Sequence, residues 1–239
     1  MTSSQPGARR GRPQGGPPLL APALAYAALT IAAVVLSAAV PHPSASAESV
    51  LAYDRAHHTA LQVAGFLISG ASVPLAIWTA TVYRRLRMLG VTAPGAVIAL
   101  AGGLLAAASL SLSGLISWTS SQVAAVAEPG LARALADLSF ATGGAGFVVP
   151  FALLLAGISV PALILHLTSR PWAWLGLVVA VAAILSTFTL LTGTLDVLLP
   201  IGRFGGVVWL IGTSVLLPHD RRAVRDAQAR DLAEVPGQS

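Results

Sequence analysis

The 239-residue sequence contains no cysteine and no lysine, and only 10% of its residues are charged. Without cysteine there are no disulfides, thiolate metal sites or thiol nucleophiles. A soluble domain carries about 25% charged residues, so this chain lacks the ionic groups that coat a water-facing surface. Hydrophobic residues make up 55%, and the mean hydropathy is +0.78. These shortages exclude an ordinary soluble domain and indicate that lipid surrounds most of the chain.

Catalytic motifs are also missing. Neither H-E-x-x-H nor G-x-S-x-G occurs, and there is no P-loop. Ser113-Gly114 invites a comparison with rhomboid proteases, but Ser111 stands where that motif has glycine. The last two apolar stretches contain no histidine that would activate the serine. We therefore expect neither enzymatic activity nor a cofactor.

What the sequence does contain is a series of apolar stretches. Each is about 21–25 residues long, enough to cross ~30 Å of hydrocarbon as a helix. They predict an all-α fold, a polytopic transmembrane bundle (19–217) between a disordered basic tail (1–18) and a charged tail (218–239). The six expected spans lie near 19–40, 59–83, 95–117, 143–165, 172–192 and 197–217.

Arginine placement predicts the orientation. Eleven of the 14 arginines fall in the two tails and in the loops after the second and fourth spans, all on one side of this topology. Arg55 and Arg133 lie on the other side, and Arg203 lies inside the last span. By the positive-inside rule, both termini are expected in the cytoplasm of a bacterial cell, with the spans in its cytoplasmic membrane. An even number of spans agrees with this placement.

The first span has a competing interpretation as a cleaved signal peptide. Arg9 and Arg10 precede the apolar run, and Ala45-Ser46-Ala47 follows it as an A-x-A cleavage site. The run is about 22 residues, however, longer than the usual 7–15. Cleavage would also leave five spans and an external N-terminus. We expect the span to be retained, with the cleaved five-span form as the alternative.

Arg203 is the most informative residue because it lies about six residues into the last span. A charge there costs about 1–3 kcal/mol unless it snorkels, pairs or faces water. It is either architectural, with Asp196 seven positions earlier as a partner, or a contact for an anion or substrate in an outward-facing polar vestibule. Serine and threonine side chains in the same region have a simpler explanation as hydrogen bonds within and between helices. The candidate vestibule residues are Arg203, Asp196, Asp137, Asp54, His58, Ser113 and Thr189.

Two long external connections, 41–58 and 118–142, each predict a helical feature. In the first, Asp54, His58 and Gln62 would share one face of a helix beginning near residue 53, a spacing that suits a divalent metal. A third strong ligand is missing, so no metal is expected. In the second, Arg133 and Asp137 lie among leucines, as in a short interfacial helix.

Three motifs carry a resemblance to known sequences: ADLSFA at 136–141, WAWLG at 172–176 and LPIGRFGGVVW at 199–209. In these the chain resembles a broad set of uncharacterised six-span bacterial integral membrane proteins that share a domain of unknown function. The resemblance covers most of the chain after residue 20. It implies the six-span topology and transfers no catalytic residue.

Two classes of function remain. The first is a non-enzymatic membrane scaffold, sensor or assembly partner that contacts the lipid bilayer and a second copy or another membrane protein, and no nucleic acid. The second is a small-molecule or ion permease with a vestibule centred on Arg203. The spans lack the acidic relay of many proton-coupled carriers, so the first class is preferred.

Overall fold

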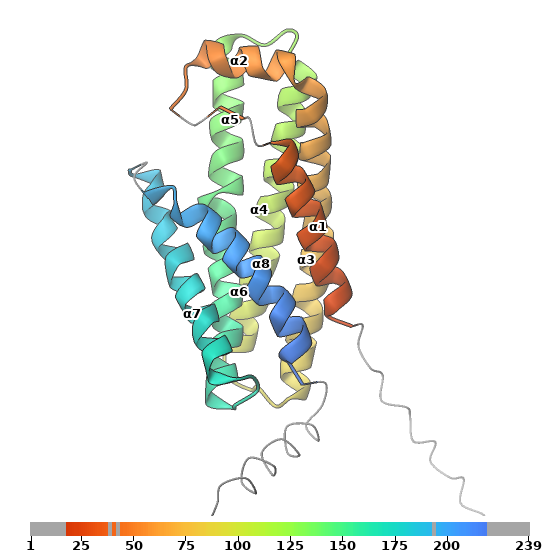
Figure 1. Cartoon of the computed structure of the whole chain (residues 1–239), viewed down its shortest axis with the longest axis vertical. Helices are drawn as coiled ribbons and strands as arrows, with labels where there is room; N and C mark the ends of the chain where they lie inside the picture. Colours follow the sequence, from red (N-terminus) through yellow and green to blue (C-terminus); the bar gives the residue numbers. More distant parts are fainter. Residues whose placement is uncertain (1–17, 38–39, 42–43, 193–194, 219–239) are drawn as a thin grey trace, which may run out of the picture.

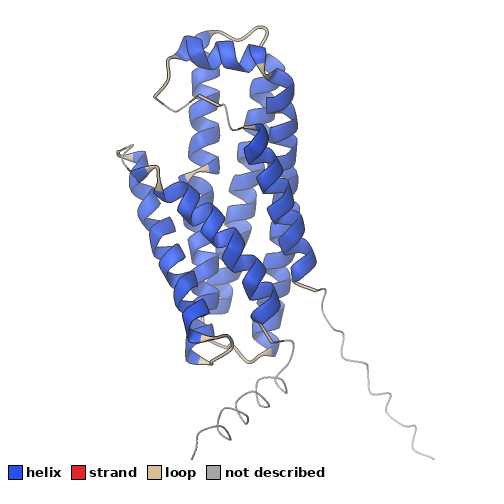
Figure 2. Ribbon diagram, viewed as in Figure 1, coloured by secondary structure: helices blue, strands red, loops and turns tan. Residues whose placement is uncertain are grey.

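The computed structural model describes residues 18–37, 40–41, 44–192 and 195–218, and over these residues the chain is helical without a strand (Figures 1 and 2). Nearly all of the two predicted tails lies outside the described residues. The helices are α1 (Leu20–Leu36), α2 (Ala47–Ala56), α3 (His58–Met88), α4 (Gly95–Val123), α5 (Pro129–Gly143), α6 (Ala145–Ile164), α7 (Arg170–Leu185), the 3₁₀ helix η1 (Ser186–Leu190) and α8 (Leu198–Leu216).

Within the residues that the structure describes, five helical segments are long and apolar enough to cross a membrane: α3, α4, the run formed by α5 and α6, the run formed by α7 and η1, and α8. Large apolar side chains point outward from them, among them Leu105, Val178 and Val208, which are each more than half exposed. Such surfaces suit lipid and not water. The all-helical polytopic fold predicted from composition is therefore confirmed. The remaining apolar helix, α1, is shorter, at 17 residues.

α3 and α4 are longer than a bilayer requires. With 31 and 29 residues they extend roughly 46 and 44 Å, against about 30 Å of hydrocarbon. Their adjoining ends, α5 and the transverse helix α2 form one end of the molecule, which we call the cap (Figure 1). Val50 and Leu51 of α2 are buried there with Ala127 and Ala132. The side chain of Ser46 accepts a hydrogen bond from the Ser49 amide, which starts α2.

The connection predicted as a separate interfacial helix has a different structure. α5 is 15 residues long and stands end to end with α6 (Figure 1), so the two form a nearly continuous helical run. The run is interrupted at Gly144, whose φ of −81° and ψ of −109° are not helical. The interruption leaves backbone groups free for other partners just where the cap meets the bundle.

The opposite half of the bundle is tightly packed. The Trp78 indole donates to the Ser214 hydroxyl at 2.8 Å, which joins α3 to α8. The Trp209 indole donates to the Trp172 carbonyl at 3.0 Å, which joins α8 to α7. Trp78 and Trp209 are fully buried, and their polar atoms have partners. This half therefore resembles a closed protein core.

Candidate functional site

A cavity of about 360 Å³ lies between the cap and the packed half of the bundle. This volume is within the range of small-molecule sites in proteins. Residues of α1, α2, α3, α4, α5, α6 and α8 contribute to its wall, so it forms only in the folded chain. Its polar lining consists of Asp54, Arg133, Asp137, Arg203, Ser37, Ser113, Ser117, Ser120 and Ser139.

Four of the predicted vestibule residues line this cavity: Asp54, Asp137, Ser113 and Arg203. The sequence placed them in four separate segments, and the fold brings them together. That these four residues bind a ligand stays a prediction.

The other three predicted residues do not line the cavity. α8 begins at Leu198, so Asp196 lies outside the helix that carries Arg203. His58 is exposed, and its Nε2 lies 3.2 Å from the Thr59 hydroxyl. Thr189 belongs to the 3₁₀ helix η1, where an α-helical span was expected.

The expected helical face shared by Asp54, His58 and Gln62 does not form, since α2 ends at Ala56 and α3 begins at His58. Asp54 and His58 therefore belong to different helices. Over the described ranges, no group of three His, Cys, Asp or Glu side chains is placed to hold a metal ion.

Arg203 stabilises the junction between α5 and α6. Its Nη2 donates a hydrogen bond to the carbonyl of Gly143, the last residue of α5. Its Cζ lies 5.2 Å from the centroid of the Phe147 ring. A helix C-terminus carries partial negative charge and the face of an aromatic ring attracts cations, so both contacts favour the guanidinium. The architectural interpretation of Arg203 thus has a structural basis, and the side chain still reaches the cavity.

Serine side chains hold the wall between α4 and α5. The Ser113 hydroxyl donates to the Ser139 carbonyl at 3.0 Å, and the hydroxyls of Ser117 and Ser139 lie 2.8 Å apart. The close approach continues at Gly143, where an added Cβ would collide with the Ser113 Oγ. These serines bond between helices, as the simpler explanation predicted, and they position the cavity lining.

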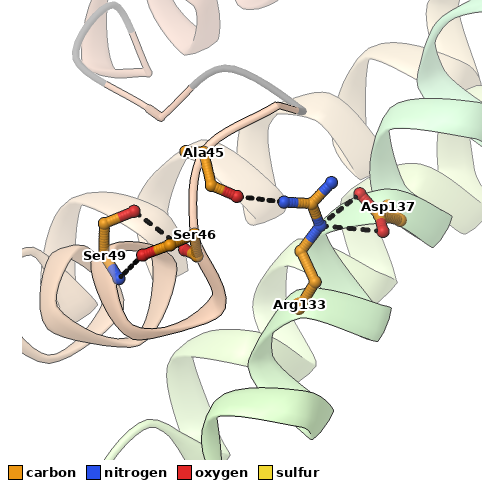
Figure 3. A network of polar contacts seen from close by, with 5 residues as sticks. All are labelled: Ala45, Ser46, Ser49, Arg133 and Asp137. Atoms are coloured by element: carbon orange, nitrogen blue, oxygen red, sulfur yellow. Dashed lines mark hydrogen bonds and ion pairs between the residues drawn. The ribbon is translucent and has the colours of Figure 1, made fainter.

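Arg133 joins α5 to the segment before α2, within the cap. Its Nε lies 2.9 Å from both carboxylate oxygens of Asp137, and its Nη1 donates to the carbonyl of Ala45 (Figure 3). Arg55 is used in the same way: it donates to the carbonyls of Ala124 at 3.0 Å and Ala127 at 3.3 Å. From the sequence, both arginines were expected to be external charges, with Arg133 in a short interfacial helix. No sequence pattern marks a backbone carbonyl as an arginine partner.

Asp54 differs from the other charged groups of the cavity. It is only 6% exposed, and it makes no hydrogen bond or ion pair with the residues that the structure describes. Burial alone raises its pKa from 3.8 to about 6. If an arginine lay close enough to compensate the carboxylate, it would lower this pKa.

This environment gives Asp54 a testable effect on stability. Because its pKa is higher in the folded than in the unfolded protein, the folded state binds the proton more tightly. Its contribution to stability is therefore present below pH 3.8 and is lost as the pH rises to about 6. We expect Asp54→Asn to remove this loss and to raise the free energy of unfolding by about 1 kcal/mol or more at pH 8.

The measurement is thermal or denaturant unfolding of both proteins between pH 4 and pH 8. Glu48→Gln is the matched control, because Glu48 is an exposed carboxylate in the same helix. Other titrating groups cancel in the difference between variant and parent. If the parent and the Asp54→Asn variant showed the same pH dependence, the expected burial cost would be contradicted.

Fold and cavity together define a class: an all-helical polytopic membrane protein with a ligand-sized cavity beneath a helical cap. Comparisons with protein families, curated proteins and solved structures found no match.

Proposed function

We propose that the protein is a six-span, non-enzymatic sensor of the bacterial cytoplasmic membrane, which binds a small molecule in the cavity from the outer side. Both termini are cytoplasmic, as the arginine distribution indicates. α1 is the sixth span: 17 residues extend about 26 Å, close to the hydrocarbon thickness. Its buried residues recur at helical spacing, at Ala23, Tyr26, Ala27, Thr30 and Ala33, which supports a helix packed against the other spans.

The observation that carries this proposal is that the cavity ends inside the bundle. Gly144, just before α6, and Val148 of α6 line it. One and two turns further on, Phe151 and Leu155 are fully buried in the core. A permease needs a path past these side chains, whereas a binding protein needs only a cavity that ends there. The packing therefore favours a sensor over the alternative, a small-molecule or ion permease.

Cysteine labelling in intact cells tests the proposal, because the chain has no cysteine of its own. We expect an external, membrane-impermeant maleimide to label Ser117→Cys in the cavity wall. Leu115→Cys, two residues away on the same helix and 53% exposed on the apolar surface, is the matched control and stays unlabelled. Thr92→Cys, in the loop after α3, is labelled only after the cells are permeabilised.

Each other result has a definite meaning. Labelling of Thr92→Cys in intact cells reverses the orientation. Protection of Ser117→Cys to the level of Leu115→Cys eliminates an open cavity. Ala152→Cys introduces a small thiol at a fully buried position of α6. Labelling of this thiol from outside would contradict the sensor and favour the permease.

A further inference from the structure

The four charged residues of the cavity lining are not equally available to a ligand. Arg133 and Asp137 are paired with each other, and Arg203 is held by the Gly143 carbonyl and the Phe147 ring. Asp54 lines the same cavity without such a contact to any described residue. It is therefore the charged group of this lining that has no hydrogen-bond or ion-pair partner among the described residues.

An ionised carboxylate in this position calls for a positive partner. Removing a charge from water is costly unless an opposite charge or several hydrogen bonds replace the solvent. A bound metal ion is a poor fit, because hard cations take several oxygen ligands and the other carboxylate of the lining, Asp137, is already paired with Arg133. An organic cation needs only the one carboxylate.

The rest of the lining indicates what such a cation is attached to. Apart from the polar groups, the wall is largely aliphatic and aromatic, with Leu61, Ile68, Val148, Leu199, Phe140 and Phe204. From Asp137 to Gly143, α5 extends the wall by about 9 Å. Arg203 bonds to Gly143, at the far end of this wall, and its positive charge repels a cation there. A ligand with its charge at Asp54 and an apolar body along the wall pairs with the carboxylate and keeps its charge away from Arg203.

We propose that the cavity binds an amphipathic organic cation whose protonated amine pairs with the Asp54 carboxylate and whose hydrocarbon part lies along α5. This inference rests on the proposed ligand-binding function of the cavity and names the chemical class of the ligand. Asp54 supplies recognition of the charge, and the aliphatic wall supplies most of the apolar contact.

The test measures how well three probes of equal chain length protect Ser117→Cys from maleimide. The full-length protein is held in lipid nanodiscs at pH 7.5, and the probes are n-octylammonium, n-octanol and octanoate. We expect octylammonium to protect at a concentration at least tenfold below that of octanol, and octanoate to protect least. Adding Asp54→Asn raises the octylammonium concentration needed by at least about tenfold. Adding Glu48→Gln, the exposed carboxylate of α2, leaves it unchanged. Unfolding curves recorded on the same samples show that each variant is folded.

The outcomes separate this inference from the proposed function. Equal protection by octylammonium and octanol, without an effect of Asp54→Asn, overturns the recognition of a cation but leaves the cavity as a binding site. Strongest protection by octanoate assigns recognition to Arg203 and also overturns it. If none of the three probes protects an otherwise accessible cysteine, binding of amphiphiles fails, and the proposed sensor function fails with it.

Discussion

Replacing Gly65 by alanine is expected to destabilise the bundle by about 1–3 kcal/mol, although the change adds a single methyl group. A Cβ at this position would lie 2.7 Å from both the Gly114 carbonyl oxygen and the Trp118 amide nitrogen. Both are backbone atoms of α4, so no side chain can turn aside and α3 must move away from α4. The reciprocal contact is as close: a Cβ on Gly114 would lie 2.5 Å from the Ser69 nitrogen.

Gly70→Ala is the matched control, because Gly70 lies in the same helix and a Cβ there meets nothing within 4 Å. Alanine is the better helix former, so this variant is expected to be unchanged or stabilised by about 0.5–1 kcal/mol. Thermal unfolding of both variants in one detergent measures the difference. Equal melting temperatures for the two would show that α3 and α4 are not held at backbone contact.

The same contact has a consequence for the cavity. Ala64 and Ile68 of α3 and Ser113 and Ser117 of α4 all line the cavity, close in sequence to Gly65 and Gly114. Separating the two helices therefore widens the cavity. Gly65→Ala should raise the octylammonium concentration needed for protection, in addition to lowering the free energy of unfolding. Small residues along these helices thus determine the shape of the candidate site.

Apolar runs predicted where helices cross lipid but not where they end. The third expected span stopped at residue 117, yet α4 continues to Val123 through Thr119, Ser120 and Ser121. Hydropathy marks the edge of the hydrocarbon, and a helix that leaves lipid is free to continue with polar residues. The cap is built from such extensions, and for that reason its architecture was not predictable from the runs alone.

The candidate site was predictable to the extent that its residues are unusual in a membrane protein. Asp54, Asp137 and Arg203 stood out as charges near or inside spans, and all three line the cavity. Where expectations failed, helical periodicity had been extended past the end of a helix. This happened between Asp54 and His58, across His57, and between Asp196 and α8. The real partner of Arg203 is the backbone carbonyl at the end of α5, and its position depends on the tertiary arrangement of two distant helices.

Arg203→Leu carries the second large expected effect, a loss of about 1–3 kcal/mol in the free energy of unfolding. Leucine has similar bulk but leaves the Gly143 carbonyl without its charged donor and the Phe147 ring without its cation. Removing a charge from a poorly solvated position offsets part of this loss. The free energy of unfolding of Arg203→Lys should lie between those of the parent and of Arg203→Leu, because an ammonium keeps the charge but lacks the planar geometry of the guanidinium.

Unfolding measurements on Arg203→Leu, Arg203→Lys and an exposed control, Arg170→Leu, test this order. The octylammonium assay gives a second readout that stability alone does not move. Arg203 is the positive charge at the far end of the cavity. Arg203→Leu should therefore lower the octylammonium concentration needed for protection in samples in which the variant is folded. A stable Arg203→Leu protein would show that the Gly143 carbonyl does not need the guanidinium. Weaker binding of the cation to that protein would contradict the repulsion assigned to Arg203.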